Sequence, residues 1–284
     1  MSIDIPAAWE WSAGAIVAHK WRKVLVLGDV DRGKSTYCHF LTQRLLTAGF
    51  RVALVDADIG QKDIGPPASI TLGYPVLERP LVEITPAAMY FVGAVSPVGH
   101  LLPMVVGTRQ LVDVAHGAFV IVNTTGFVHG VGRVLKGYKI EALQPDVIVA
   151  LAQGAELQAL LRAYRHIHTL RIPASARAMV KTPEQRREAR ERAFCVYFQH
   201  ATEVTLPWRK LIIQRHSIPG ALPPHLLCGL ADRRNRGLGL ALVKNIDAAN
   251  DHVALFTPVP ADRIGILQCG DLCISPDGCE LGRS

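Results

Sequence analysis

The stretch LVLGDVDRGKSTYCHFL (25–41) decides the fold, because it runs from an apolar segment through a glycine-bracketed loop into an amphipathic segment. Its centre is a complete G-x-x-x-x-G-K-[ST] string. The string lies between an expected strand, 23–28, and an expected helix that stops at Gly49, which is the context that a phosphate-binding loop requires. A coincidental glycine-rich turn would lack that context. The nucleotide-binding residues predicted here are Gly28, Asp29, Val30, Asp31, Arg32, Gly33, Lys34, Ser35 and Thr36.

Each fixed position of the string has a physical role. The glycines let backbone N–H groups close around phosphate oxygens, and the following helix directs its positive dipole end toward them. We expect Lys34 to reach the β- and γ-phosphates, and the Ser35 hydroxyl, with Thr36 beside it, to serve Mg²⁺. No N-K-x-D or T-K-x-D string follows that would recognise guanine, so the expected cofactors are ATP and Mg²⁺.

Two carboxylates follow the next apolar run, RVALVDAD (51–58). In a parallel sheet, the carboxyl end of this expected strand opens onto the same crevice as the phosphate loop. Asp56 and Asp58 are two positions apart on an extended chain and therefore point the same way. We expect both to serve the metal, and Asp58 also to accept a proton from an incoming hydroxyl. For Asp56, capping of the following turn is the alternative.

The order of expected elements predicts an α/β fold with a parallel P-loop NTPase sheet flanked by helices. Further strands are expected at 89–95, 118–125, 146–152 and 168–173, and helices at 107–115 and 155–164. From residue 204 the sequence pattern changes to short apolar runs separated by glycine and proline, which is typical of β structure. We therefore expect one domain over 1–203 and a small β-rich C-terminal domain over 204–284.

The composition of the chain indicates where the protein is located and the state of its cysteines. No apolar run approaches the roughly 20 residues that span a bilayer, and the start lacks a basic-then-apolar signal, so a cytoplasmic protein without membrane association is expected. The six cysteines contain no repeated C-x-x-C pair and are expected to be free thiols.

The positive charge of the chain is regional. Between residues 160 and 236, fifteen Lys or Arg stand against five Asp or Glu, a balance of +10. The whole chain carries +7, so the remainder sums to −3. This concentration favours a polyanionic partner, with solvated surface as the alternative.

Four segments, taken in order, resemble the polynucleotide 5′-hydroxyl kinases of RNA processing: GDVDRGKST (28–36), DADIGQ (56–61), NTTGFVHGVGRVL (123–135) and RREARERAF (186–194). That family includes the kinase of mRNA 3′-end formation, the kinase of pre-rRNA processing, and shorter bacterial and archaeal relatives. The resemblance covers nearly the whole chain. It implies transfer of the ATP γ-phosphate to the 5′-hydroxyl end of RNA or DNA, by a P-loop kinase domain with an arginine-rich lid near residues 177–194.

The resemblance also assigns residues beyond the phosphate loop. Asp58 and Gln61 fall on the D-x-D-x-G-Q element, near the metal and the attacking hydroxyl. Thr124, Gly126 and Phe127 fall on the T-x-G-W segment that clasps the phosphate-loop lysine, with Thr124 as a catalytic residue. Phenylalanine replaces the tryptophan, so an indole N–H contact is lost. For Thr124, an ordinary strand-end role is the alternative.

The lid element R-S-x-x-x-R appears here as KTPEQR (181–186). Lys181 replaces the first arginine, Arg186 matches the second, and Arg190 lies four residues further on the same helical face. Thr182 followed by Pro183 predicts the start of this helix independently. The alternative is a solvated helix whose charges pair locally. Arg186 and Arg190 are thus expected catalytic residues, and Gln61, Gly126, Phe127 and Lys181 expected substrate-binding residues.

Two other functions compete with 5′-end phosphorylation. One is an ATP-binding module of the same fold without phosphotransfer, because Phe127 and Lys181 change functional positions. The other is a P-loop kinase or ATPase with a different acceptor. The sequence leaves RNA and DNA both open as acceptors, and it does not identify protein partners.

Overall fold

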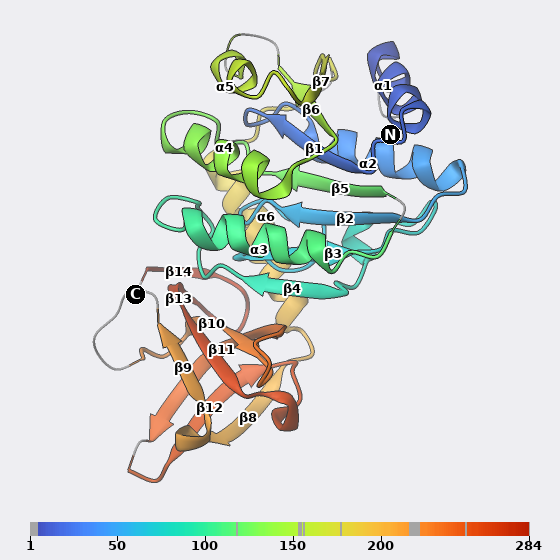
Figure 1. The fold of residues 1–284 in the computed structure, drawn as a ribbon. Coiled ribbons are helices and arrows are strands. Elements are labelled where there is room, and N and C mark those ends of the chain that lie inside the picture. Colours follow the sequence, from blue (N-terminus) through green and yellow to red (C-terminus); the bar gives the residue numbers. More distant parts are fainter. Residues whose placement is uncertain are drawn as a thin grey trace.

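The computed structural model describes residues 5–117, 119–152, 155, 157–176, 178–215, 222–247 and 249–283. Within these ranges the chain forms two seven-stranded sheets, one above the other in Figure 1. Helices cover the first sheet, and the strands of the second sheet follow α6 along the chain. The expected α/β class with an additional β-rich part is confirmed.

The first sheet has the strand order β4-β3-β2-β5-β1-β6-β7. The five strands from β2 to β7 in that order run parallel, whereas β3 pairs antiparallel with β2, and β4 pairs antiparallel with β3. The sequence pattern did not predict β3, and it placed β4 too far toward the C-terminus. The strands are β1 (Lys23–Gly28), β2 (Val52–Ala57), β3 (Ser69–Gly73), β4 (Ala88–Phe91), β5 (Phe119–Thr124), β6 (Val147–Leu151) and β7 (His168–Ile172).

Both faces of the first sheet are buried. Val24 and Val26 pack with Trp9 and Tyr37 on one face, and Leu25 and Leu27 pack into the core of the other. This two-sided burial explains why the strands read as continuous apolar runs. No described helix is both long and apolar enough to cross a membrane. The helices are α1 (Ala7–Ala18), α2 (Lys34–Thr47), α3 (Leu101–Asp113), α4 (Val131–Leu143), α5 (Gln158–Ala163) and α6 (Pro183–Phe198).

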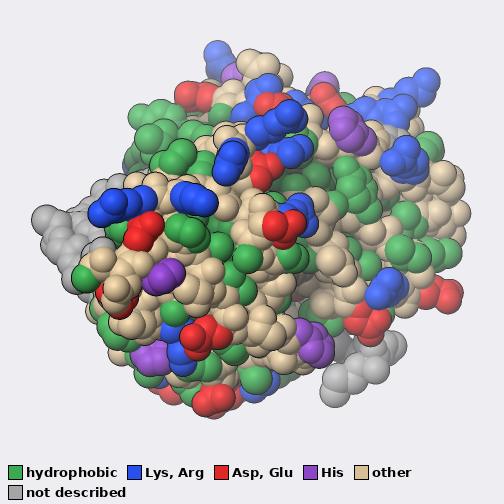
Figure 2. Space-filling model, turned by 90° about the horizontal axis from the view of Figure 1, so that it is seen from below, with side chains coloured by type: hydrophobic (Ala, Val, Ile, Leu, Met, Phe, Trp, Pro, Cys, Tyr) green, Lys and Arg blue, Asp and Glu red, His purple; other side chains and the backbone are tan. Residues whose placement is uncertain are grey.

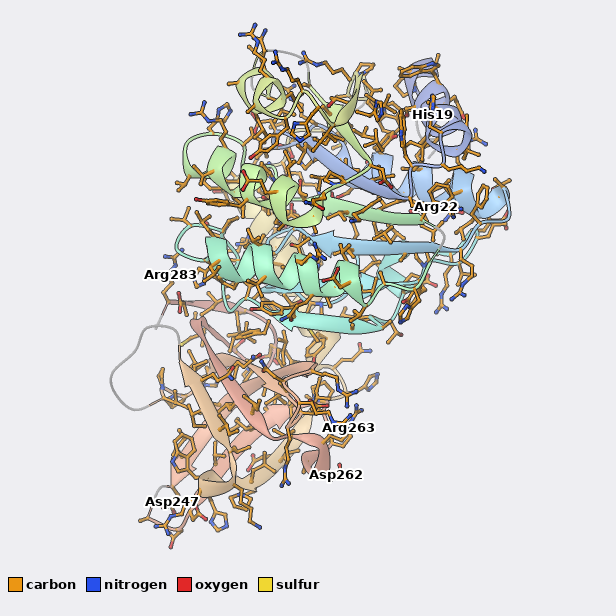
Figure 3. All side chains as sticks on the ribbon, viewed as in Figure 1. His19, Arg22, Asp247, Asp262, Arg263 and Arg283 are labelled. Carbon is orange, nitrogen blue, oxygen red and sulfur yellow. The ribbon has the colours of Figure 1, made fainter. Side chains whose placement is uncertain are left out.

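The second sheet begins at β8, so the expected boundary between residues 203 and 204 falls inside its first strand, and the division into domains stays a prediction. The β11–β12 hairpin, which carries Asp247, projects away from the first sheet (Figure 3). Its strands are β8 (Thr202–Pro207), β9 (Ile212–Arg215), β10 (Leu226–Ala231), β11 (Gly237–Asp247), β12 (His252–Thr257), β13 (Ile266–Ile274) and β14 (Glu280–Arg283).

Helix α6 connects the two sheets. The Thr182 hydroxyl accepts a hydrogen bond from the Gln185 backbone N–H, and the Gln185 side chain accepts one from the Thr182 N–H, which confirms the predicted helix start. At the other end, Phe194 and Phe198 pack into a cluster with Phe91 of the first sheet and Leu227 of the second. The helix therefore begins near the phosphate loop and ends between the sheets.

The end of the molecule below the second sheet carries mixed charge. In Figure 2, Lys and Arg side chains on this face lie among Asp and Glu, with hydrophobic side chains between them. The basic excess of residues 160–236 therefore does not produce a surface of a single sign on this face.

Candidate active site

One pocket collects residues from the phosphate loop, the acidic loop after β2, the segment after β5 and the start of α6. Its volume is about 330 Å³. Residues that are far apart in the sequence thus converge on a single space, as the motifs predict. The pocket is lined by Val30, Asp31, Gly33, Lys34, Ser35, Thr36, Asp58, Gln61, Gly126, Ala178, Met179, Lys181 and Arg186.

The phosphate loop has the backbone of an anion cradle. Gly33 adopts a left-handed conformation (φ 75°), and α2 begins at the next residue, so the free N–H groups of its first turn face the pocket. Gly126 packs directly against the backbone of the phosphate loop, because a Cβ there would lie 2.7 Å from the Val30 backbone nitrogen. The predicted nucleotide-binding role of this loop therefore has a matching geometry.

Lys34 lies at the base of the pocket and is only 8% exposed. Its ammonium group donates to the Asp29 carbonyl oxygen at 2.8 Å. Burial lowers the pKa of Lys34, and the nearby Asp58 carboxylate opposes that change most strongly among its neighbours. The side chain is thus a desolvated cation next to a carboxylate at the pocket wall.

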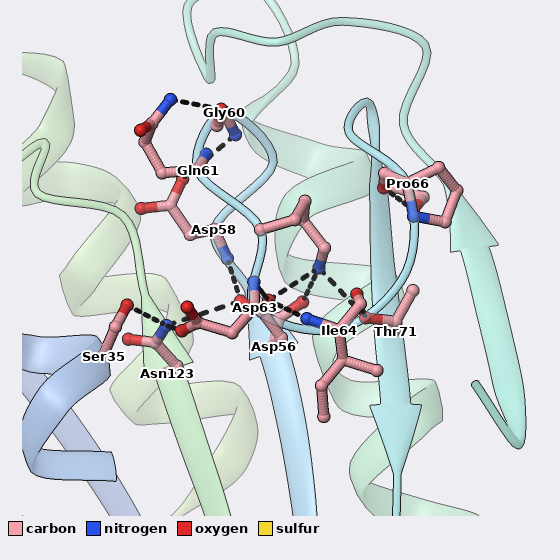
Figure 4. A network of polar contacts seen from close by, with 12 residues as sticks. Ser35, Asp56, Asp58, Gly60, Gln61, Asp63, Ile64, Pro66, Thr71 and Asn123 are labelled. Carbon is pink, nitrogen blue, oxygen red and sulfur yellow. Dashed lines mark hydrogen bonds and ion pairs between the residues drawn. The ribbon is translucent and has the colours of Figure 1, made fainter. Parts of the chain in front are cut away.

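Asp58 faces the pocket from the end of β2. One of its oxygens accepts the N–H groups of Gly60 and Gln61, both at 3.0 Å, and the carboxyl group directs its other oxygen away from this turn (Figure 4). The Gln61 amide donates to the Arg186 carbonyl oxygen at 3.1 Å and so ties this turn to the lid. The structure thus brings Asp58, Gln61 and Arg186 together.

Asp56 is fully buried, and both of its oxygens are occupied. One oxygen pairs with Lys62 at 3.2 Å and accepts the N–H groups of Asp63 at 2.8 Å and Ile64 at 3.2 Å. The other accepts the Asp58 N–H at 3.2 Å. This is the turn-capping alternative, so the structure does not support Asp56 as a metal ligand.

Asp63 and Asn123 lie beside Ser35, and neither residue is among those predicted from the sequence. The Asn123 side-chain amide joins the other two side chains. The Asn123 amide nitrogen lies 3.2 Å from Ser35 Oγ and 3.5 Å from Asp63 Oδ2. Burial, followed by the nearby Asp56 charge, raises the pKa of Asp63 to about 7. Asp63 stands two residues after the D-x-D-x-G-Q element and Asn123 one residue before the T-x-G segment, so the motifs stop just short of them.

The segment after β5 contributes less than predicted. Thr124 is fully buried, and its hydroxyl donates to the Val26 carbonyl oxygen at 2.8 Å, which is the strand-end alternative and leaves it out of the pocket lining. Phe127 does not line the pocket either. A different side chain ties this segment to the phosphate loop, because His129 Nε2 lies 3.2 Å from Asp29 Oδ2.

Two lysines of α4 are buried beneath this segment. Lys136 donates to the Thr125 carbonyl oxygen at 2.6 Å and to its hydroxyl at 3.2 Å. The Lys139 ammonium nitrogen is buried and has no hydrogen-bond partner among the described residues. Burial lowers the pKa of Lys139 to about 7 and that of Lys136 well below its usual value.

The two predicted lid arginines have different partners. Arg186 donates to Asp31 Oδ2 at 2.5 Å, at the pocket wall, and the Lys181 backbone N–H lies 3.2 Å from the same oxygen. Arg190 instead forms a two-point ion pair with Glu280 of β14, at 2.5 and 3.0 Å. The structure therefore places Arg186 in the pocket and Arg190 outside it, because a carboxylate from the second sheet captures Arg190.

The comparisons with known proteins agree with these motifs. Proteins named polyribonucleotide 5′-hydroxyl-kinase are similar along most of their length: that of Pyrococcus furiosus is 34% identical over 99% of this chain and 96% of its own. That of Pyrococcus abyssi is 39% identical over 92% and 90%. The solved structure of the wild-type Clp1p–Pcf11p complex matches the fold with a TM-score of 0.69 at 13% identity, covering 93% of this chain and 78% of that one.

A family model gives the same assignment. The model described as mRNA cleavage and polyadenylation factor CLP1 P-loop matches residues 28–200, which include the phosphate loop, the acidic loop and α6. The expected resemblance is thus confirmed, and this chain belongs to the CLP1 P-loop family.

Proposed function

We propose that this protein is a polynucleotide 5′-hydroxyl kinase that transfers the γ-phosphate of ATP, with Mg²⁺, to the 5′-hydroxyl end of RNA. The observation that carries the proposal is the convergence of Lys34, Asp58 and Arg186 on one pocket beside the start of α2. Relatives that match nearly the whole chain are named for this activity on polyribonucleotides, and this supports RNA as the acceptor.

Phosphoryl transfer asks the protein mainly for positioning and charge stabilisation. Lys34 and the N-terminal N–H groups of α2 would hold the β- and γ-phosphates. Asp58 would orient the incoming 5′-hydroxyl and accept its proton at the carboxylate oxygen that points away from the Gly60 turn. Arg186, already at the pocket wall, would stabilise charge on the transferring oxygens.

The residues around Ser35 fit a magnesium ion. The Ser35 hydroxyl, the Asp63 carboxylate and the Asn123 amide provide the hard oxygen donors that Mg²⁺ prefers. Bound there, the ion would supply positive charge against the negative charge that develops on the phosphate during transfer. Within the described part of the chain, no group of three His, Cys, Asp or Glu side chains could hold a metal alone, as expected where the nucleotide phosphates supply ligands.

The test is a transfer assay with γ-labelled ATP and matched RNA and DNA oligonucleotides that carry a 5′-hydroxyl. We expect label on the RNA end with the native protein, and none with Lys34→Ala. Asp262→Asn, an exposed carboxylate on the short helix Ala261–Arg263, is the matched control and should retain transfer. Nucleotide binding without label on either oligonucleotide would contradict the proposal.

A second candidate is an ATP-binding module without transfer. It is favoured by Phe127 lying outside the pocket lining and by the capture of Arg190 by Glu280. The same assay separates the two functions, because the module would bind ATP tightly and label no acceptor. Label on free nucleosides in preference to oligonucleotides would instead indicate a kinase with a different acceptor.

A further inference from the structure

The acidic loop contains three carboxylates, and they occupy different environments. Asp58 faces the pocket, Asp56 is buried and accepts hydrogen bonds mainly from its own turn, and Asp63 lies with Ser35 around the Asn123 amide (Figure 4). Ser35 is the loop hydroxyl expected to serve the metal of the nucleotide. Asp63 and the Ser35 hydroxyl both contact the Asn123 amide nitrogen, at 3.5 and 3.2 Å, so Asp63 lies beside the hydroxyl expected to serve the metal.

Asp56 is unsuited to that position because the fold already uses it. Lys62 both pairs with its carboxylate and donates to its backbone carbonyl oxygen at 2.7 Å, and the side chains of both residues are buried. Lys62 also donates to the Thr71 hydroxyl of β3 at 3.0 Å. A buried ion pair with these further hydrogen bonds stabilises the turn. Removing either side chain would leave the charge of the other buried without a partner.

Asn123 supplies an independent indication of a missing ligand. The residue is 1% exposed, and its amide oxygen has no hydrogen-bond partner among the described residues. A buried amide oxygen without a partner is costly and needs an explanation, such as an ion or an ion-bound water. Its amide nitrogen lies within 3.5 Å of both Ser35 and Asp63, so the unpaired oxygen belongs to the same cluster.

We propose that Asp63 and Asn123, together with Ser35, form the protein side of the Mg²⁺ site, and that the Asp56–Lys62 pair is a structural strut that positions Asp63. This inference rests on the proposed use of a metal–nucleotide complex. Mg²⁺ keeps several waters and takes the rest of its ligands from phosphates, so one carboxylate and one amide beside the hydroxyl suffice.

The test measures metal binding separately from catalysis. Protein-bound Mn²⁺ is titrated by electron paramagnetic resonance in the presence of a non-hydrolysable ATP analogue, and the affinity for the analogue is measured again in EDTA. Asp63→Asn should weaken Mn²⁺ binding about 10- to 100-fold. Its affinity for the analogue in EDTA should stay within about twofold of the native value. Asp63→Glu should recover part of the loss.

The matched control is Asp113→Asn, an exposed carboxylate at the end of α3. It should bind Mn²⁺ as the native protein does, and a thermal melt of each variant establishes that it is folded. Native Mn²⁺ affinity in a folded Asp63→Asn variant would overturn the inference and leave the kinase proposal standing. Conversely, a native protein that binds Mn²⁺ and the analogue tightly but labels no RNA end would refute the kinase proposal and leave the metal site standing.

Discussion

The acidic loop after β2 and the lid helix α6 both bring charged groups to the pocket, but they hold them differently. In the loop, the backbone N–H groups that Asp56 and Asp58 accept all lie within eight residues, and Asp56 has one distant contact, the Asn123 amide at 3.4 Å. In the lid, Arg186 and Arg190 bind carboxylates from distant segments, Asp31 and Glu280. The turn of the loop is thus held mainly by local hydrogen bonds, whereas the role of each lid arginine is decided by contacts with distant parts of the chain.

The largest effect is expected at the loop residue that faces the pocket. Asp58→Asn keeps the turn-forming oxygen but removes the base, so single-turnover transfer should fall by about 10²- to 10⁴-fold. ATP affinity, measured by calorimetry, should change little. Asp262→Asn serves again as the surface control. Transfer within tenfold of the native rate would show that Asp58 does not accept the proton.

Asp56→Asn tests the loop as a structural network. The variant leaves the Lys62 charge buried without its partner, so the free energy of unfolding should fall by about 3–5 kcal/mol. Urea denaturation measures this value. Asp113→Asn, which breaks an exposed pair with Arg109, should cost less than about 1 kcal/mol. Similar small losses for both variants would contradict the assignment of Asp56 as a buried strut.

Lys139 is a third case beside the loop and the lid, because its ammonium group has neither a local nor a distant hydrogen-bond partner among the described residues. Its pKa is lowered from 10.5 to about 7, so between about pH 7 and 10.5 the unfolded chain binds a proton that the folded chain does not. Stability should therefore rise with pH in this window. Lys139→Met should flatten that rise and stabilise the protein by about 1–3 kcal/mol near pH 7, as measured by urea denaturation.

The exposed Lys244 of β11 provides the control for this variant. Lys244→Met should leave both the stability and its dependence on pH close to native. An unchanged slope in Lys139→Met would mean that the Lys139 amine does not titrate at a lowered pKa in the folded protein.

The smallest effect is expected at the lid arginine outside the pocket. Arg190→Ala should lower the free energy of unfolding by about 1–2 kcal/mol, because it removes a partly buried two-point ion pair, and nucleotide affinity should stay native. Arg192→Ala, on the exposed side of the same helix, should change neither quantity measurably. A transfer defect in Arg190→Ala larger than that of Arg186→Ala would reverse the roles assigned to the two arginines.

The sequence was most informative where structure is local. The phosphate loop, the ends of β1 and β2 and the Thr182 cap all follow from short motifs and propensity, and the structure has them. Asp63 and Asn123 were not predicted as site residues, because they come together only through the pairing of β2 with β5 and the path of the loop back toward Ser35. Arg190 was misplaced because nothing in the spacing of α6 reveals that Glu280, ninety residues later, lies beside it.

The 16-residue helix α6 spans about 24 Å as a single rigid rod, at about 1.5 Å per residue. Its phenylalanines pack between the sheets and help to fix the rotation of the helix about its axis, which directs Arg186 toward the phosphate loop. Inserting one residue between Arg186 and Phe194 would turn the guanidinium by about 100° around the helix axis, because an α-helix has about 3.6 residues per turn. The packing of the aromatic cluster between the sheets therefore helps to determine the direction in which Arg186 points at the opposite end of the helix.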